Sequence, residues 1–213
     1  MTRQKNIIVN CPACLEDGSF KIYSSINTNE NPEIKESIFN REIFKFSCPN
    51  CGEEILVAYN CTYTDPENQY IVALLSDNEE SDDSIVKVEG YTLRIVRTIN
   101  EFVEKIALIE DRIDDKVIEL YKIMLEDQFE DERPGAKILG IYYGGRNFED
   151  NSLLFFIITE NAENCRAMLS MQTYNAIEGQ FAASSHKYAD ISEVNRLWAI
   201  GALQTDFGGG TEE

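Results

Sequence analysis

Four cysteines in two matching pairs are the residues of this sequence with the clearest chemistry. They form the motifs Cys11-Pro12-Ala13-Cys14 and Cys48-Pro49-Asn50-Cys51. Zn²⁺ takes four soft or borderline ligands in a tetrahedron, and two CxxC turns supply two thiolates each. Four protein ligands leave no open position for water, so an ion bound in this way is structural. The pattern predicts one structural zinc ion held by Cys11, Cys14, Cys48 and Cys51.

The residues around the cysteines favour tight turns. A proline after the first cysteine of each pair fixes φ, and the amides that follow it remain free to donate to sulfur. Gly52 directly follows the second pair and suits a left-handed turn residue. Leu15 stands at the corresponding place after the first pair. We therefore expect the first loop to be longer than the second or strained.

Dithiol redox chemistry is the competing interpretation of the two pairs. CPxC motifs also occur in disulfide oxidoreductases, where the first cysteine lies at a helix N-terminus that lowers its pKa. Neither pair here is followed by helical periodicity, so zinc is favoured over redox chemistry. Spacing does not distinguish zinc from iron in a site of four cysteines.

No other set of residues forms a recognisable catalytic group. His186 is the only histidine, which excludes the usual triads beyond a single possible base. Cys61 and Cys165 lie in apolar or strand-like segments, where a cysteine is usually a small buried hydrophobe. The sequence therefore names no catalytic residue and no cofactor besides Zn²⁺, and it favours a binding module over an enzyme.

The charge of the chain is strongly negative and unevenly placed. The formal net charge is −19, yet residues 1–60, with eight acidic and six basic side chains, carry only −2 of it. Between Glu101 and Glu132 there are twelve acids against four bases. Such a surface repels phosphate, so generic nucleic-acid binding is disfavoured and a solvated helix face is predicted. We interpret Asp111, Asp114 and Asp115 as acids at a helix start and not as ligands of a hard cation.

No export or membrane signal is visible. The first ten residues contain only three consecutive apolar residues, and the longest apolar run, residues 153–158, is too short to span a bilayer. These features predict a cytoplasmic protein with no membrane partner. In a reducing compartment, paired cysteines indicate metal or redox chemistry and not disulfides.

Residues 1–60 predict two hairpins around the cysteine pairs. Residues 7–9 and 20–24 read as strands flanking the first pair, and residues 43–46 and 55–59 as a hairpin that faces the first. Between them, residues 31–39 predict a short helix with Asn31 as N-cap and Pro32 at its first position.

The middle of the chain alternates between strand and helix signals. Residues 70–75 and 91–97 predict strands, separated by an acidic linker at residues 77–84. Thr98 and Glu101 have the spacing of a capping box. Two sets of apolar residues each lie on one helical face: Phe102, Ile106 and Ile109, and then Val117, Leu120 and Met124. This pattern fits two helices or one bent helix.

The last part of the chain predicts a second lobe, joined at residues 129–135. Residues 137–143 and 152–159 read as antiparallel strands around Gly144 and Gly145, with a third strand at 165–171. Helices are expected at 172–181 and at 193–203, the latter capped by Ser192, before a short disordered tail. The predicted domains are therefore residues 1–126 and 127–213.

The sequence resembles the bacterial and archaeal CpXC-domain proteins in three features: the two cysteine pairs, the helix that begins at Asn31-Pro32-Glu33, and the segment from Tyr91 to Asp115. The resemblance covers about residues 5–125. It implies a zinc-ribbon-like fold and carries the metal site to Cys11, Cys14, Cys48 and Cys51. It implies no activity. The fold expected is thus α+β, a zinc-ribbon-like β-hairpin domain with helices, followed by a small lobe of antiparallel sheet and helices.

Three functions are compatible with these features. The first is a non-enzymatic cytoplasmic module that binds protein partners, with the acidic helices favouring basic ones. The second is a thiol redox enzyme that uses one of the CPxC pairs. The third is a zinc ribbon that contacts nucleic acid through Lys21, Lys35, Arg41 and Lys45.

Overall fold

A computed structural model describes residues 1–76, 87–161 and 164–207 of the chain. The predicted linker at residues 77–84 and the predicted tail lie wholly or largely outside these residues. The chain forms two compact units, Met1–Val103 (unit 1) and Glu104–Glu213 (unit 2). The sequence-based boundary between residues 126 and 127 falls inside helix α3 (Asp115–Glu132).

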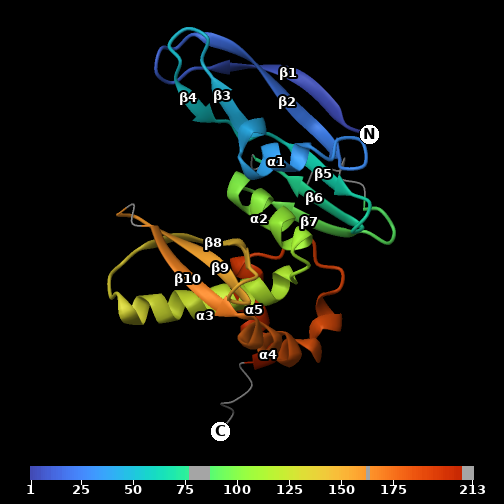
Figure 1. Cartoon of the computed structure of the whole chain (residues 1–213), viewed down its shortest axis with the longest axis vertical. Helices are drawn as coiled ribbons and strands as arrows, with labels where there is room; N and C mark the ends of the chain where they lie inside the picture. Colours follow the sequence, from blue (N-terminus) through green and yellow to red (C-terminus); the bar gives the residue numbers. More distant parts are fainter. Residues whose placement is uncertain (77–86, 162–163, 208–213) are drawn as a thin grey trace. The chain divides into compact units, whose positions relative to one another are not determined.

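Unit 1 contains a five-stranded sheet and a separate hairpin (Figure 1). The sheet has the order β1-β2-β5-β6-β7, and its strands are β1 (Arg3–Asn10), β2 (Asp17–Asn27), β5 (Cys61–Asp65), β6 (Tyr70–Leu74) and β7 (Thr92–Val96). The hairpin consists of β3 (Lys45–Ser47) and β4 (Glu54–Leu56). The predicted strands around both cysteine pairs and at residues 70–75 and 91–97 are confirmed, whereas β5 was missed.

The β1–β2 hairpin is long, and most of it extends beyond the part of the sheet that pairs with other strands. β1 pairs with β2 from Arg3 to Asn10, but β2 pairs with β5 only at Ser25–Asn27. One face of the hairpin is apolar, because Phe20 and Ile22 are buried. This face packs on the second hairpin, where the rings of Phe20 and Phe46 lie 5.8 Å apart in an edge-to-face contact.

Two short helical segments connect β2 to β3. Helix α1 spans Ile34–Phe39 and is followed by a 3-10 turn at Glu42–Phe44. The prediction of Asn31 as N-cap was wrong: the N-cap is Glu33, which makes no capping bond, and the Asn31 amide donates to its carboxylate at 3.1 Å. The helix is held by burial of Ile34 and Ile38.

Helix α2 (Ile99–Glu110) begins at the predicted capping box. Thr98 Oγ1 accepts the backbone N–H of Glu101 at 3.2 Å, and Glu101 Oε2 accepts the N–H of Thr98 at 3.0 Å. Phe102 is fully buried and meets Phe44 and Tyr63 edge to face. Aromatic packing of this kind forms much of the unit 1 core.

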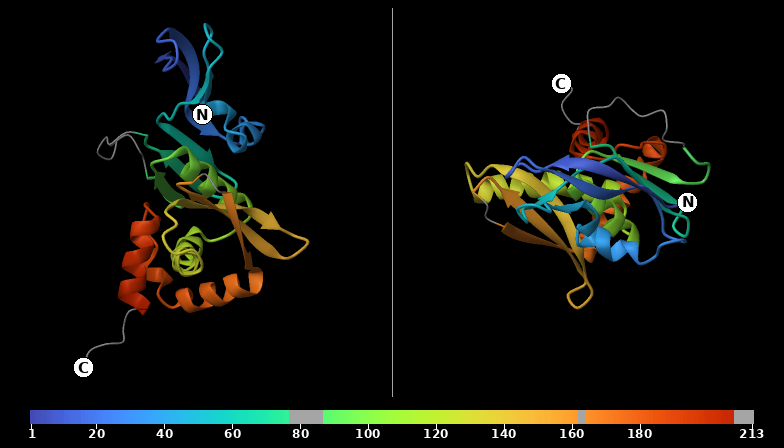
Figure 2. Two further views of the ribbon diagram at one scale, coloured as in Figure 1. Left: turned by 90° about the vertical axis from the view of Figure 1, so that its left-hand side faces the viewer. Right: turned by 90° about the horizontal axis from the view of Figure 1, so that it is seen from above.

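Unit 2 contains the long helix α3, a sheet and two further helices that surround it (Figures 1 and 2). The sheet is antiparallel in the order β10-β9-β8, from β8 (Ile138–Asn147), β9 (Ser152–Thr159) and β10 (Asn164–Ser170). The helices are α4 (Met171–Ala182) and α5 (Arg196–Ala202), separated by a 3-10 turn at Ser185–Tyr188. The α+β class and the three predicted strands of this lobe are confirmed.

Several local details of unit 2 correct the sequence prediction. The β8–β9 turn lies at residues 148–151, while Gly145 stands within β8 at φ 123°, where the register shifts. Helix α5 begins at Arg196 and is capped by Asn195, whose side chain accepts the N–H of Trp198, so Ser192 is not the cap. Met124 is 52 % exposed and does not join the buried face of α3.

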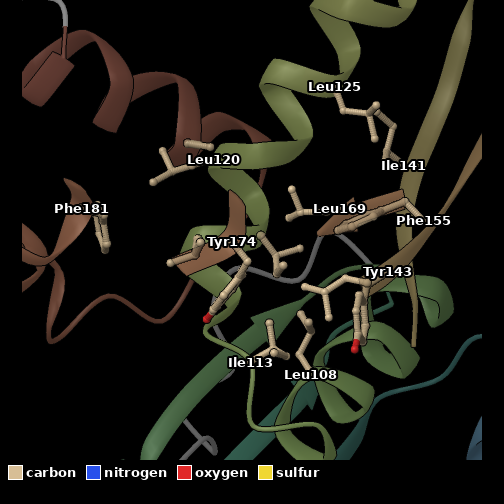
Figure 3. Close-up of a cluster of buried hydrophobic side chains, with 14 of the residues drawn as sticks. Leu108, Ile113, Leu120, Leu125, Ile141, Tyr143, Phe155, Leu169, Tyr174 and Phe181 are labelled. Atoms are coloured by element: carbon tan, nitrogen blue, oxygen red, sulfur yellow. The ribbon is translucent and has the colours of Figure 1, made fainter. Parts of the chain in front are cut away.

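The core of unit 2 is a single apolar cluster, which Figure 3 shows in close-up. Alternate residues of β9, Leu153, Phe155 and Ile157, are buried against it. α3 contributes Val117 and Leu120. The period of two on the strand and the helical spacing on α3 agree with the sequence pattern.

A cluster of five charged side chains is also buried in unit 2. Lys105 lies 3.0 Å from Asp115 and 3.2 Å from Glu119, and Lys122 lies 2.7 Å from Glu104 and 3.0 Å from Glu119. Each residue is at most 9 % exposed. We call these five residues the buried charge cluster. The prediction that the acids of this region form a solvated helix face was therefore wrong for Glu104, Asp115 and Glu119.

Candidate metal centre

Each cysteine pair occupies a turn of the same construction. We call residues 11–16 the first knuckle. In it, the N–H of Leu15 donates to the carbonyl of Cys11 at 2.9 Å, and the N–H of Cys11 donates to the carbonyl of Glu16 at 3.0 Å. We call residues 48–53 the second knuckle. In it, the N–H of Gly52 donates to the carbonyl of Cys48 at 3.0 Å, and the N–H of Cys48 donates to the carbonyl of Glu53 at 2.8 Å. This is the bonding of a tight turn closed by a bulge whose first residue is left-handed. Both loops therefore have the same length.

The two knuckles differ in the residue at the left-handed position. Gly52 has φ 77°, and Leu15 has φ 62°. Glycine takes this conformation without cost, whereas a residue with a Cβ is strained by about 1 kcal/mol or more. The expected strain is thus present at Leu15, without the longer loop that was its alternative.

The four thiols meet where the turns of the two hairpins come together. All four sulfur atoms lie within 4.8 Å of one another. Two contacts cross between the knuckles, Cys11 to Cys51 and Cys14 to Cys48, each at 3.6 Å. A tetrahedral Zn–S₄ centre has sulfur atoms about 3.8 Å apart, given bonds of about 2.3 Å. All four cysteines are free thiols, and the group can hold one metal ion.

A glycine in β2 allows the hairpins to approach this closely. A Cβ on Gly18 would lie 2.5 Å from the ring of Phe46 and 3.0 Å from Pro49. Glycine inside a strand often marks such an approach of another backbone or side chain. This role of Gly18 was not predicted from the sequence.

The turn amides and the neighbouring thiols act unequally on the second pair. Backbone N–H groups of Cys51 and Asn50, together with the thiols of Cys14 and Cys11, outweigh burial and lower the pKa of Cys48 to about 6. The N–H of Glu53 acts to lower the pKa of Cys51, but the thiols of Cys14 and Cys11 and burial raise it to about 12. A metal ion binds the thiolate form, so an ion held by these four sulfurs would replace their remaining protons.

The cysteines outside the knuckles lie apart from this centre. Cys61 is buried in β5, and burial raises the pKa of its thiol. Cys165 lies in β10, half-buried, and accepts a hydrogen bond from Arg133 Nη1 at 3.2 Å. His186 is exposed on the 3-10 turn after α4.

The aspartates around the start of α3 have structural partners. Asp111 accepts the hydroxyl of Tyr143 at 2.6 Å. Asp114 caps α3 by accepting the N–H of Lys116, and Asp115 belongs to the buried charge cluster. Within the described residues, no group of three or more possible ligands gathers except the four knuckle cysteines.

Three of the four basic residues considered for nucleic-acid contact are engaged within unit 1. Lys35 lies 3.7 Å from Asp65, and Lys45 lies 2.7 Å from Glu54. Arg41 donates to Asn100 at 3.1 Å. Lys21 has no ion pair with a described residue and lies over the ring of Tyr23. Ion pairs of this kind reduce the positive charge that these side chains present to a phosphate backbone.

Comparison with protein families identifies the chain. The model of the family described as CpXC protein matches residues 9–122, more than half of the sequence. The chain belongs to the CpXC family. The match contains both knuckles of this CpXC protein and ends within α3. No curated protein and no solved structure matches the chain.

No helix of the described residues is both long and apolar enough to cross a membrane.

Proposed function

We propose that this CpXC protein is a non-enzymatic, cytoplasmic protein-interaction module, built on a zinc-ribbon-like pair of hairpins in which Cys11, Cys14, Cys48 and Cys51 hold one structural Zn²⁺. The observation that carries the proposal is the convergence of four free thiols within 4.8 Å, from two turns of the same construction. Four thiolates suit zinc, and they complete its tetrahedral shell.

The chemistry of such a centre favours a scaffold over a catalyst. A fully ligated zinc ion binds neither water nor substrate. When bound it supplies a rigid link between the two knuckles, and the chain's own residues supply the surfaces. The binding role is favoured because the described site offers a closed metal centre and no accompanying set of catalytic side chains.

The exposed acids of α3 indicate one kind of partner. Asp127, Glu130, Asp131 and Glu132 are exposed near the end of the helix, in contrast to the buried acids of its first half. A negative surface raises the association rate of positively charged partners and is screened by salt. Basic protein partners therefore fit this part of unit 2.

A thiol redox enzyme is the second candidate, because the pKa of Cys48 is lowered to about 6. A thiolate near neutral pH is the nucleophile of dithiol exchange. In oxidoreductases that thiolate lies at a helix N-terminus, whereas the knuckles here lead into the strands β2 and β4. Insulin reduction by the metal-loaded protein at neutral pH would favour this candidate over the scaffold.

The test is quantitative metal analysis joined to affinity capture. The tagged protein is isolated from its native host beside two variants, Cys48→Ser, which removes a predicted ligand, and Cys165→Ser, a matched control outside the centre. We expect one zinc per chain in the parent and the control and a stoichiometric partner captured by both, with zinc and partner lost in Cys48→Ser. Bound iron would replace zinc in the proposal, and a partner retained by zinc-free Cys48→Ser would contradict it.

A further inference from the structure

Strand β1 is an open edge of the five-stranded sheet. It stands at the end of the strand order and pairs only with β2 among the described strands. Of its eight residues, six are exposed and two are half-buried. Figure 2 shows the β1–β2 hairpin from two directions. An edge strand of this length is a template for an additional strand.

The hydrogen bonds of the first knuckle establish which backbone groups face outward. The N–H of Cys11 donates to Glu16, toward β2, and the direction alternates along an antiparallel strand. Val9, Ile7 and Lys5 therefore face β2. The N–H and carbonyl groups of Gln4, Asn6 and Ile8 point away from the sheet, and they make no hydrogen bond to a described residue.

The open edge carries positive charge in a strongly acidic protein. Arg3 and Lys5 are exposed on β1, and Lys21 is exposed on β2 opposite Asn6. None of the three makes an ion pair with another described residue. Asp17 is the one acid within these two strands, and the amide of Asn10 donates to it at 3.2 Å. The edge is thus complementary to carboxylates.

The knuckle end of the same hairpin is apolar and strained. Ile8 is 68 % exposed and Leu15 is 73 % exposed. Backbone hydrogen bonds hold the left-handed conformation of Leu15: its N–H donates to the carbonyl of Cys11, and its carbonyl accepts the side-chain amide of Asn10 at 2.8 Å. Its side chain stays exposed and is not needed for these bonds. Non-glycine residues in this conformation occur often at binding sites, and the exposed side chains of Ile8 and Leu15 offer an added strand an apolar contact.

We infer that the outer edge of β1 binds an extended segment of a partner protein as an added strand, with acidic side chains opposite Arg3 and Lys5 and an apolar side chain near Ile8 and Leu15. The partner's backbone supplies hydrogen bonds to Gln4, Asn6 and Ile8, and its side chains supply specificity. This inference rests on the proposed function, because it gives the module a binding surface in unit 1, in addition to the exposed acids of α3.

A second copy of the chain fits the edge poorly. β1 contains two basic residues and no acid, so β1 paired with β1 brings like charges together. Each copy also carries a net charge of −19. Charge complementarity therefore favours a different, acidic segment.

The test uses synthetic peptides and the zinc-loaded full chain. The probes are an alternating glutamate–valine octapeptide, its lysine–valine counterpart, and a glutamate–valine peptide N-methylated at alternate residues, which blocks one hydrogen-bonding edge. Binding is followed by amide chemical shifts and fluorescence anisotropy at several salt concentrations. We expect the acidic peptide alone to shift the amides of β1, more weakly as salt rises.

Matched variants locate the binding on the edge. Asn6→Pro removes one outward N–H and leaves the bonds to β2, whereas Asn6→Thr keeps that N–H. We expect about tenfold weaker binding for Asn6→Pro, less than about twofold change for Asn6→Thr, and a switch to the lysine peptide for Arg3→Glu with Lys5→Glu. Equal binding by the two Asn6 variants, shifts confined to other strands, or no β1 shift at millimolar peptide would overturn the inference.

The same variants separate this inference from the proposed function. If Asn6→Pro still captures a zinc-dependent partner from the host, the module stands and the β1 edge is not its binding surface. If no captured partner depends on zinc, the proposed function fails whatever the peptides show. A dimer of the parent chain that dissociates in Asn6→Pro would assign the edge to self-association and overturn the inference.

Discussion

The candidate metal centre of unit 1 and the buried charge cluster of unit 2 bring polar groups together in opposite ways. The first gathers four thiols, all of which become negative when they bind a metal. The second gathers three carboxylates and two ammonium groups within 3.2 Å of a partner. Four thiolates would need a cation from solution, whereas the buried charge cluster contains its own counterions.

This difference implies different sources of stability. The proposed zinc ion ties the two hairpins of unit 1, whose own strands β3 and β4 are only three residues each. Unit 2 has a continuous apolar cluster, and its buried charge cluster pairs three carboxylates with two ammonium groups, a formal sum of −1. We therefore expect unit 1 to respond to the supply of metal and unit 2 to respond to changes in charge.

The largest effect should follow removal of the metal. Chelation, or Cys48→Ser, should collapse the chemical-shift dispersion of the unit 1 amides, while the amide resonances of β8–β10 and α3 persist. The effect should be large because binding energies of structural zinc are on the order of 10 kcal/mol. Amide spectra with bound-zinc analysis measure this. Full retention of the β1 to β4 resonances in metal-free protein would show that the thiols need no cation.

Removal of one cation from the buried charge cluster should have the next largest effect. Lys122→Met leaves Glu104 and Glu119 short of a partner, and loss of one member of a buried pair costs about 3–5 kcal/mol. Lys137→Met is the matched control, since Lys137 pairs with Glu160 on an exposed surface and should cost less than about 1 kcal/mol. Denaturant unfolding of unit 2 gives both values. Similar losses for the two variants would contradict the distinction.

Acid should weaken the cluster through Glu119. Burial alone would raise the pKa of this residue, but Lys122 and Lys105 outweigh burial and lower it. A lowered pKa stabilises the fold above the unfolded value of 4.5 and loses that contribution as pH falls through the folded value. The stability difference between the parent and Glu119→Gln should therefore be constant near neutral pH and shrink below about pH 4.5. A difference that grows on acidification would mean that burial dominates.

Features that depend on neighbouring residues were predictable from the sequence. The paired CxxC motifs predicted the thiol cluster, and the Thr98–Glu101 spacing predicted the start of α2. The apolar residues of β9 fall at a period of two, which gave the strand and its buried face. The capping box and the strand period are local, so a few adjacent residues specify them. The two cysteine pairs are far apart in the sequence, but they could be joined because a tetrahedral metal site needs four ligands.

Features that depend on distant partners were not predictable. Glu104 and Glu119 look like surface acids until Lys122 and Lys105 are placed beside them by the packing of two helices. Gly144 resembles a turn residue, but it lies in β8, where a Cβ would clash with the ring of Phe156 on β9. The role of Gly18 depends on Phe46 of the other hairpin.

The smallest effect tests the difference between the two knuckles. Gly52→Ala should destabilise unit 1 by about 1 kcal/mol from the left-handed backbone alone, because the added Cβ meets nothing within 4 Å. Leu15→Gly should be neutral or stabilise it by up to about 1 kcal/mol, since relief of strain opposes the greater freedom of glycine in the unfolded chain. Thermal unfolding at a fixed free-zinc concentration measures both.

The sign of the Leu15→Gly effect is the informative result. A leucine that can be replaced without loss of stability contributes nothing within the fold, and its exposed side chain is then available for contact with a partner. If Leu15→Gly also weakens binding of the acidic peptide, stability and binding separate at a single residue. Destabilisation of more than about 1 kcal/mol would instead assign Leu15 a packing role in the first knuckle, because loss of buried apolar surface has a cost of this size.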